Sequence, residues 1–180
     1  MKKMMCVAML GIALLLMGCP ARSIFPLFEE KDLVFNQDLL GTWVDSDKEE
    51  YTFLKSSGGD YDVLVRSKDG SVQLLSAKLG QLGGSWFLDS SPGEKNSDYH
   101  LLPTHVITRI WLQGDTLKTA SLEGDYLKDA IAAGQLTVPH VQDGSDILLT
   151  APTKELQQLV LRLAEIDAAF SGPSTLVRLK

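Results

Sequence analysis

Residues 49–79, EEYTFLKSSGGDYDVLVRSKDGSVQLLSAKL, decide the fold, because three strand-like segments follow one another with turn residues between them. In segments 49–55 and 61–67, apolar and polar side chains alternate, which is the period of a strand with one buried face. The Asp69-Gly70 pair favours a tight turn, since glycine accepts the positive φ that such turns require. The stretch therefore predicts an antiparallel meander.

Similar signals continue on both sides of this stretch. We expect further strands at 38–44, 85–89, 106–112 and 116–122, and a last short hairpin at 136–141 and 147–150. Residues 123–134 predict one short helix with an acidic start and Gly134 at its end. From residue 152 to 170 the apolar residues recur at helical spacing and form one stripe, made of Leu156, Leu159, Val160, Leu163, Ile166 and Phe170.

This pattern predicts a mainly β fold. A meander of about eight antiparallel strands loses its unpaired edges when the sheet closes into a barrel. We therefore expect an antiparallel β-barrel of about eight strands, with a short helix before the last strands and a C-terminal amphipathic helix packed on the sheet.

The N-terminus has the layout of a secretory signal peptide. Two lysines open the chain and an apolar run, residues 7–17, follows. The run is shorter than the about 20 apolar residues that a membrane-spanning helix needs. Cys19 directly follows the small Gly18, and this junction resembles the lipobox of bacterial lipoproteins. An ordinary signal peptide is the alternative, but Met17 fits its cleavage site poorly.

The lipobox resemblance implies a location in the cell and attachment to a membrane. It implies cleavage after residue 18, and diacylglyceryl and acyl chains on Cys19 that anchor the protein in the bacterial cell envelope. In a Gram-negative cell that means the outer membrane or the periplasmic face of the inner membrane. Pro20 is not the aspartate that retains some lipoproteins at the inner membrane, which favours the outer one.

The composition of the mature chain excludes several classes. Its length suits one domain with a core of its own.

Cys6 is lost with the leader, so the mature chain cannot form an internal disulfide. Loss of the two leader lysines takes the formal charge from −6 to −8. This acidic balance argues against nucleic acid as a partner and leaves membrane attachment to the acyl chains.

These features divide the chain into four predicted segments. They are a lipoprotein signal peptide at 1–18, a tether at 19–37, a barrel at 38–151, and a C-terminal helix with a tail at 152–180. The tether contains two prolines and has no clear period. Its apolar residues favour docking on the domain and are Ile24, Phe25, Leu27 and Phe28.

Gly41-Thr42-Trp43 is the Gly-x-Trp tripeptide that lipocalins and their relatives carry on their first barrel strand. Together with the leader, segment 106–118 and the terminal helix, it makes the chain resemble a family of lipocalin-like bacterial lipoproteins of unknown function. The resemblance covers about residues 38–165. It implies that Trp43 closes the base of the barrel and that an arginine of a later strand packs across the indole. Gly41, Trp43 and Arg109 are the residues to which we assign this closure.

Residues suited to catalysis or metal binding are scattered. His100, His105 and His140 lack the spacing of a metal site, so we expect no metal or other cofactor. Adjacent carboxylates at 29–30 and 49–50 point to opposite faces of a strand. The sequence has neither a nucleophile elbow nor a phosphate loop. We therefore do not expect an enzyme, and an unrecognised hydrolase is the remote alternative.

Two functions stay open. In the first, the barrel binds a small apolar molecule, with candidate lining residues Tyr51, Phe53, Val63, Val65, Trp86 and Trp111. In the second, side chains fill the barrel, which acts through its outer surface as an envelope scaffold, assembly factor or inhibitor. A pocket of about 300 Å³ or more, open at one end, would favour the first.

Overall fold

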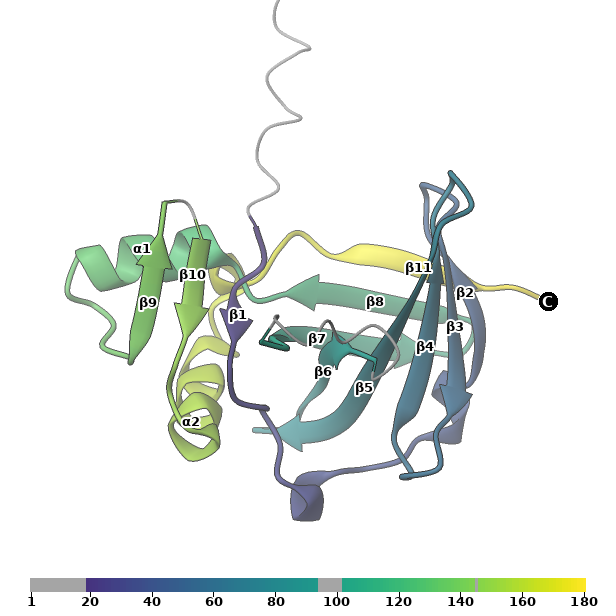
Figure 1. The fold of residues 1–180 in the computed structure, drawn as a ribbon, viewed down its shortest axis with the longest axis horizontal. Helices are drawn as coiled ribbons and strands as arrows, with labels where there is room; N and C mark the ends of the chain where they lie inside the picture. The colour runs from purple at the N-terminus through teal and green to yellow at the C-terminus, as the bar shows by residue number, and fades with distance from the viewer. Residues whose placement is uncertain (1–18, 94–101, 145) are drawn as a thin grey trace, which may run out of the picture.

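The computed structural model describes residues 19–93, 102–144 and 146–180. The predicted signal peptide, Cys6 and His100 lie outside the described residues. Eight antiparallel strands form a closed barrel, because β6 pairs with both β5 and β7 (Figure 1). The predicted antiparallel barrel is confirmed. Its strands are β2 (Gly41–Val44), β3 (Glu50–Lys55), β4 (Tyr61–Arg66), β5 (Val72–Leu82), β6 (Ser85–Pro92), β7 (His105–Gln113), β8 (Thr116–Ser121) and β11 (Ser174–Arg178).

The C-terminal tail supplies the strand that closes the barrel. β11 pairs with β2 on one side and with β8 on the other. The hairpin expected at 136–150 is present as β9 (His140–Asp143) and β10 (Asp146–Leu149), but it lies outside the barrel. There β10 pairs with the short β1 (Arg22–Ser23), which in turn pairs with β7. The strand after the amphipathic helix therefore belongs to the barrel, and the hairpin before that helix does not.

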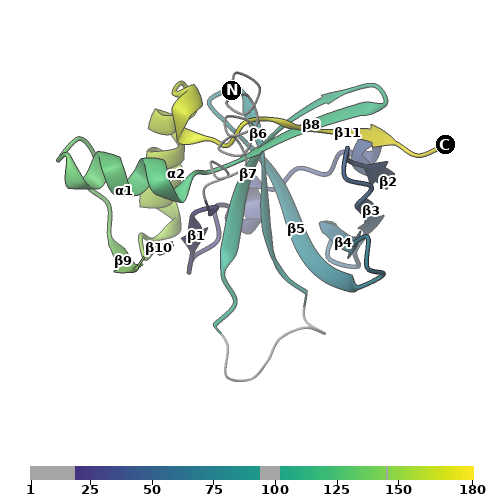
Figure 2. The ribbon, with the colours of Figure 1, turned by 90° about the horizontal axis from the view of Figure 1, so that it is seen from above.

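Both helices lie on one side of the barrel, together with β1, β9 and β10 (Figures 1 and 2). They are α1 (Gly124–Ala132), before the last strands, and α2 (Thr153–Leu163). The helix predicted at 152–170 ends at Leu163. Four residues of its apolar stripe, Leu156, Leu159, Val160 and Leu163, are buried as the helical spacing predicts, whereas Ile166 is 39 % exposed and Phe170 is buried after the helix has ended. The described residues also contain the 3₁₀ segments η1 (Glu30–Asp32), η2 (Gln37–Leu39) and η4 (Asp167–Ala169).

The segment expected as a tether packs against the barrel. Ala21, Leu27 and Phe28 are each at most 2 % exposed. The ring of Phe28 lies on Gly80 of β5, where an added Cβ would come within 2.4 Å of the ring. Docking is thus confirmed for Leu27 and Phe28, whereas Ile24 is half-buried and Phe25 is 40 % exposed. Residues 19–37 are held on the domain through these buried side chains.

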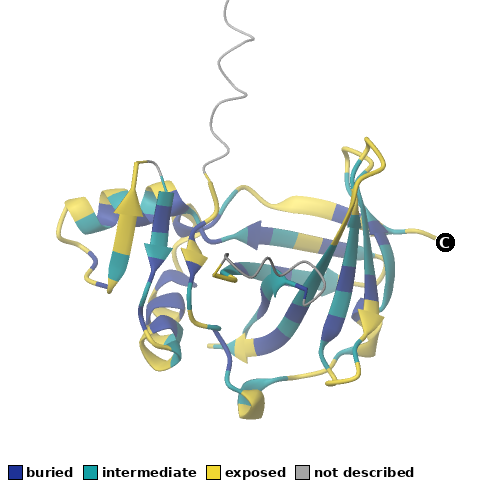
Figure 3. Ribbon diagram, viewed as in Figure 1, coloured by how far each residue is buried: buried dark blue, intermediate teal, exposed yellow. Residues whose placement is uncertain are grey.

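The described residues form two hydrophobic cores, one on each face of the barrel wall. Figure 3 shows buried residues along the barrel strands and in the helices beside them. The inner core fills much of the barrel. The outer core joins the wall at β6, β7 and β8 to the N-terminal segment, both helices and β10. Because side chains alternate along a strand, each of these wall strands contributes to both cores.

We name the two ends of the barrel by their residues. The mouth is the end where β7 begins, at His105, and β8 ends, at Ser121. The base is the opposite end, at the β7–β8 turn formed by Gly114 and Asp115, with η2 across it.

Candidate functional site: the interior of the barrel

A cavity of about 280 Å³ opens at the mouth. Its apolar lining comes from six strands and consists of Phe53, Val63, Leu75, Ala77, Leu88, Leu117 and Leu176. Successive side chains of a strand point to opposite faces, and each of these residues lies on the face that points into the barrel. The pocket is therefore part of the barrel lumen rather than a surface groove.

Hydroxyl groups give the mouth cavity its polar part. Five of its lining residues carry an aliphatic hydroxyl, namely Ser90, Thr108, Thr119, Ser121 and Ser174. Tyr51 adds a phenol, whose hydroxyl donates a hydrogen bond to Glu49 Oε2 at 3.1 Å. Burial, followed by this hydrogen bond, raises the pKa of Tyr51 well above its ordinary value, so the phenol stays neutral.

Among the described residues, the charge that lines the mouth cavity is one carboxylate. Asp45 lines the cavity, and its Oδ1 accepts the backbone N–H groups of Asp47 and Glu49. Among the described lining residues there is no lysine, arginine or histidine. The lining is thus apolar with neutral hydrogen-bonding groups and one acidic group.

The middle and base of the barrel are packed around Trp43. Its side chain is fully buried, and its Nε1 donates to the Leu39 carbonyl of η2 at 2.9 Å. The Arg178 guanidinium lies over the indole, 4.1 Å from the ring centroid. Nη1 of Arg178 donates to the Leu40 carbonyl at 2.6 Å, and Nη2 donates to the Asp38 carbonyl. One planar cation thus ties the last strand to both Trp43 and η2.

Gly41 makes room for this arginine. It has a φ of +114°, and a Cβ placed there would lie 2.9 Å from Nη1 of Arg178. Glycine suits both requirements because it has no Cβ and tolerates positive φ. Gly41 and Trp43 of the tripeptide therefore act together with Arg178.

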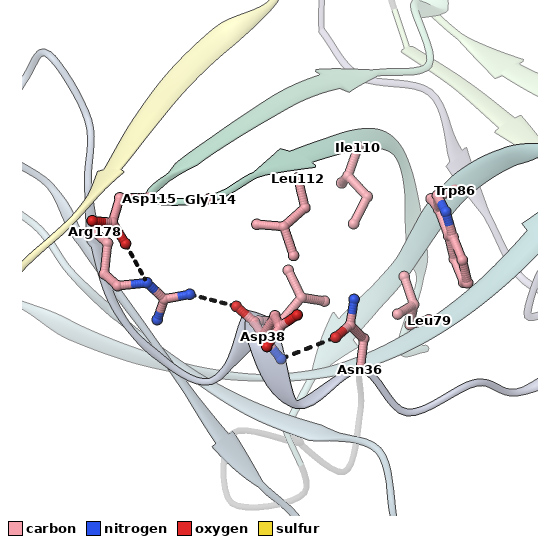
Figure 4. A pocket seen from close by; sticks show the side chains of 10 residues that line it. Asn36, Asp38, Leu79, Trp86, Ile110, Leu112, Gly114, Asp115 and Arg178 are labelled. Carbon is pink, nitrogen blue, oxygen red and sulfur yellow. Dashed lines mark hydrogen bonds and ion pairs between the residues drawn. The ribbon is translucent and has the colours of Figure 1, made fainter.

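A second cavity, of about 510 Å³, opens at the base (Figure 4). Its apolar wall consists of Leu39, Leu79, Trp86, Ile110 and Leu112. Polar groups stand opposite this wall, where Arg178 Nε lies 3.4 Å from Asp115 Oδ1. The two cavities share no lining residue. The interior therefore offers two separate spaces.

The structure corrects the role of Arg109. This residue points out of the barrel, where its guanidinium lies 4.8 Å from the Trp111 ring centroid and 5.9 Å from that of Phe170. Its Nη1 donates to the carbonyl of Ala164, the C-cap of α2, at 2.8 Å. A cation is favourable at a helix C-terminus. Arg109 thus holds α2 on the wall, and Arg178 occupies the place over Trp43.

The six candidate lining residues divide among four places. Tyr51, Phe53 and Val63 line the mouth cavity. Val65 packs against the inner core, and Trp86 lines the base cavity. Trp111 packs against the outer core, so its assignment to the lumen was wrong. The reason is the alternation of β7, in which Ile110 and Leu112 face inward and Trp111 does not.

Sequence reasoning missed several lining residues. They include the five hydroxyl residues of β6, β7, β8 and β11, since serine and threonine carry no strong burial signal. Leu176 and Arg178 were also missed. Their spacing of two, in a β-branched tail, is the signal that could have placed both on one inward face.

The described histidines make structural contacts. His105 Nδ1 lies 2.7 Å from Oδ1 of the buried Asp89, whose Oδ2 accepts the N–H of Leu27 at 2.8 Å. His140 Nδ1 lies 2.9 Å from the Val138 carbonyl. Within the described chain, no three His, Cys, Asp or Glu residues gather as metal ligands would. None of the helices that the structure describes has the length and hydropathy to span a bilayer.

The fold and the site define a class, a closed eight-stranded antiparallel barrel with a lumen that opens at the mouth. Comparison of the chain with protein families, with characterised proteins and with solved structures found no match. The inference about function therefore depends on the residues described above.

Proposed function

We propose that this protein is a lipoprotein of the bacterial cell envelope, anchored through Cys19, whose lipocalin-like barrel binds one small apolar ligand in its mouth cavity. The observation that carries the binding proposal is the cavity of about 280 Å³ inside the closed barrel. Pockets for drug-sized ligands measure about 300–1,000 Å³. The mouth cavity lies just below this range and below the size expected above for a ligand pocket, so the ligand is a small one.

The lining sets the chemistry of this ligand. Apolar side chains surround its body, and the hydroxyls of the wall receive one polar group. Asp45 and the absence of a cation among the described lining residues disfavour a carboxylate head, such as that of a fatty acid. The ligand is therefore a neutral lipophilic molecule with a hydroxyl or carbonyl group.

The anchoring proposal rests on the leader and on Cys19. The small-residue–cysteine junction after an apolar run supports lipidation, and Cys19 is an exposed free thiol. The support for a lipocalin-like barrel is the arrangement of Gly41, Trp43 and Arg178 at the base, together with the eight-stranded meander.

Filling the cavity tests the binding proposal. We expect Ala77→Phe to occupy the lumen and to weaken binding of a neutral fluorescent probe, N-phenyl-1-naphthylamine, by about tenfold or more. Ser76→Phe is the matched control, because its side chain points out of the same strand. Equal probe binding by both variants and the parent would contradict the proposal and favour the filled barrel that acts through its surface.

A further inference from the structure

We propose that the lipid anchor joins the folded domain without a flexible spacer, so that the face around Cys19 lies against the headgroups of the bilayer. We call this surface the anchor face and define it by Cys19, Pro20, Arg22, Asp125, Lys128 and Asp146. The inference rests on the lipidation of Cys19 in the proposed function and adds where the membrane lies.

The backbone is fixed from the first residue of the mature chain. The Cys19 carbonyl accepts a hydrogen bond from Gly124 N at 3.1 Å, and Ala21 N donates to the Leu122 carbonyl at 2.8 Å. Between them, Pro20 forms a bridge with Glu123. Ala21 itself is only 2 % exposed. A lipid bonded to Cys19 would therefore begin directly at the surface of the folded domain.

A hollow beside Cys19 suits the first part of the lipid. It measures about 200 Å³ and is lined by Cys19, Pro20, Arg22, Asp146 and Ile147. Pro20 and Ile147 give it apolar walls, and the Arg22 guanidinium stands at its edge, 2.9 Å from Asp146 Oδ2. Guanidinium groups donate to ester and phosphate oxygens. The hollow can therefore receive the glyceryl group attached to the sulfur of Cys19.

The anchor face contains two cations, and each is paired with a carboxylate. Arg22 pairs with Asp146, and Lys128 Nζ lies 2.6 Å from Asp125 Oδ1, while Glu123 lies beside them against Pro20. The mature chain as a whole is strongly acidic, which would repel an anionic membrane surface. The two cations reduce this repulsion where the domain meets the headgroups.

The anchor lies nearer to the mouth of the barrel than to its base. Glu123, which bridges Pro20, follows two residues after Ser121 of the mouth cavity. The base turn is at the other end of β8, about 20 Å away at about 3.3 Å per residue. Figure 1 shows β8 pointing toward β1 and the helices. A lipophilic molecule dissolved in the bilayer would therefore reach the mouth first.

Fluorescence quenching in vesicles tests this arrangement. In the lipidated protein the sulfur of Cys19 is blocked, so one new cysteine can carry a bimane label. The sites are Asp125→Cys on the anchor face and Ser57→Cys in the β3–β4 turn, which Figure 1 places at the opposite end of the molecule. In phosphatidylcholine vesicles with nitroxide-labelled headgroups, we expect the label at 125 to lose most of its fluorescence and the label at 57 to keep it.

A variant with a flexible spacer distinguishes the effect of a rigid connection between lipid and domain from the effect of lipidation alone. About 12 Gly/Ser residues between Cys19 and Pro20, with a reach of about 20 Å, keep the lipid but release the domain. We expect quenching at 125 to fall to the level at 57. Equal quenching of the two labels in the parent, or no effect of the spacer, would contradict the proposal that the lipid anchor joins the domain without a flexible spacer. A mature chain whose mass lacks the lipid would overturn the anchoring itself, and this inference with it.

Discussion

At the base of the barrel, the buried indole of Trp43 makes contacts that no smaller side chain can replace. Its Nε1 holds η2 through the Leu39 carbonyl, and its face carries the guanidinium of Arg178. We expect Trp43→Ala to lower the free energy of unfolding by about 3–5 kcal/mol, as for other buried aromatic residues. A denaturant titration measures this, with the partly exposed Trp111→Ala as the control that loses less. A loss under about 1 kcal/mol for Trp43→Ala would contradict its placement.

The two arginines show what a single sequence can predict at the residue scale. The Gly-x-Trp resemblance implies an arginine over the indole, and the residue that lies there is Arg178. The sequence favours Arg109 because an apolar strand surrounds it, but this strand is apolar on both faces. One face lies in the lumen and the other lies under α2, so hydrophobicity could not tell which side Arg109 takes.

Glu123 makes stability depend on pH. Burial, with the nearby carboxylate of Asp125 as the smaller cause, raises the pKa of Glu123 above its ordinary value. As the pH rises through that range, the unfolded chain loses this proton before the folded chain does, so the contribution of Glu123 to stability falls. We expect Glu123→Gln to be more favourable, relative to the parent, at about pH 7 than at about pH 4. Equal differences in the free energy of unfolding at the two pH values would contradict this.

At the scale of elements, the N-terminal segment is held by a close contact between Phe28 and β5. The ring of Phe28 lies so close to Gly80 that position 80 has no space for a side chain, and Phe28 is almost fully buried. We expect Gly80→Ala to cost about 1–3 kcal/mol, because a rigid ring must move. Gly172→Ala is the control, since a Cβ at that position meets nothing within 4 Å. If the two variants unfold at the same denaturant concentration, the segment is not docked as described.

The closing strand is a second element whose removal has a clear consequence. Without residues 173–180, β2 and β8 lose the partner between them, and the inner core loses Leu176. We expect this truncation to abolish cooperative thermal unfolding, because an open barrel exposes both its lumen and its edges. Removal of Lys180 alone should leave the transition unchanged. A cooperative transition in the longer truncation would show that β11 is dispensable.

The elements themselves were well predicted where their signals were local. Alternation and turn residues found β3, β4 and β5, and helical spacing found α2. The closing role of β11 depends on pairing across more than a hundred residues, between Val177 and Val44, which local patterns do not contain. The same reason explains why residues 19–37 looked like a tether: two prolines and no period conceal a segment that is buried by distant partners.

At the scale of the whole molecule, the sequence predicted a barrel but not its internal volume. Large inward side chains fill the middle of the lumen, among them Trp43, Phe53 and Tyr61. Smaller ones, such as Ala77 and the hydroxyl residues, leave the mouth open. Whether aromatic residues fill or line a barrel depends on how they pack together. This property belongs to the assembled fold, and no single strand reveals it.

The open half of the lumen is the part of the molecule that we propose holds a ligand. The most direct test is native mass spectrometry of the domain, exported behind a cleavable signal without Cys19 so that no detergent is needed, and purified from its own cell envelope. We predict one small neutral lipophilic molecule per chain, absent from the Ala77→Phe variant and identified by extraction. A bare protein mass, unchanged after challenge with neutral apolar probes, would contradict the claim and leave the outer surface as the functional part of the barrel.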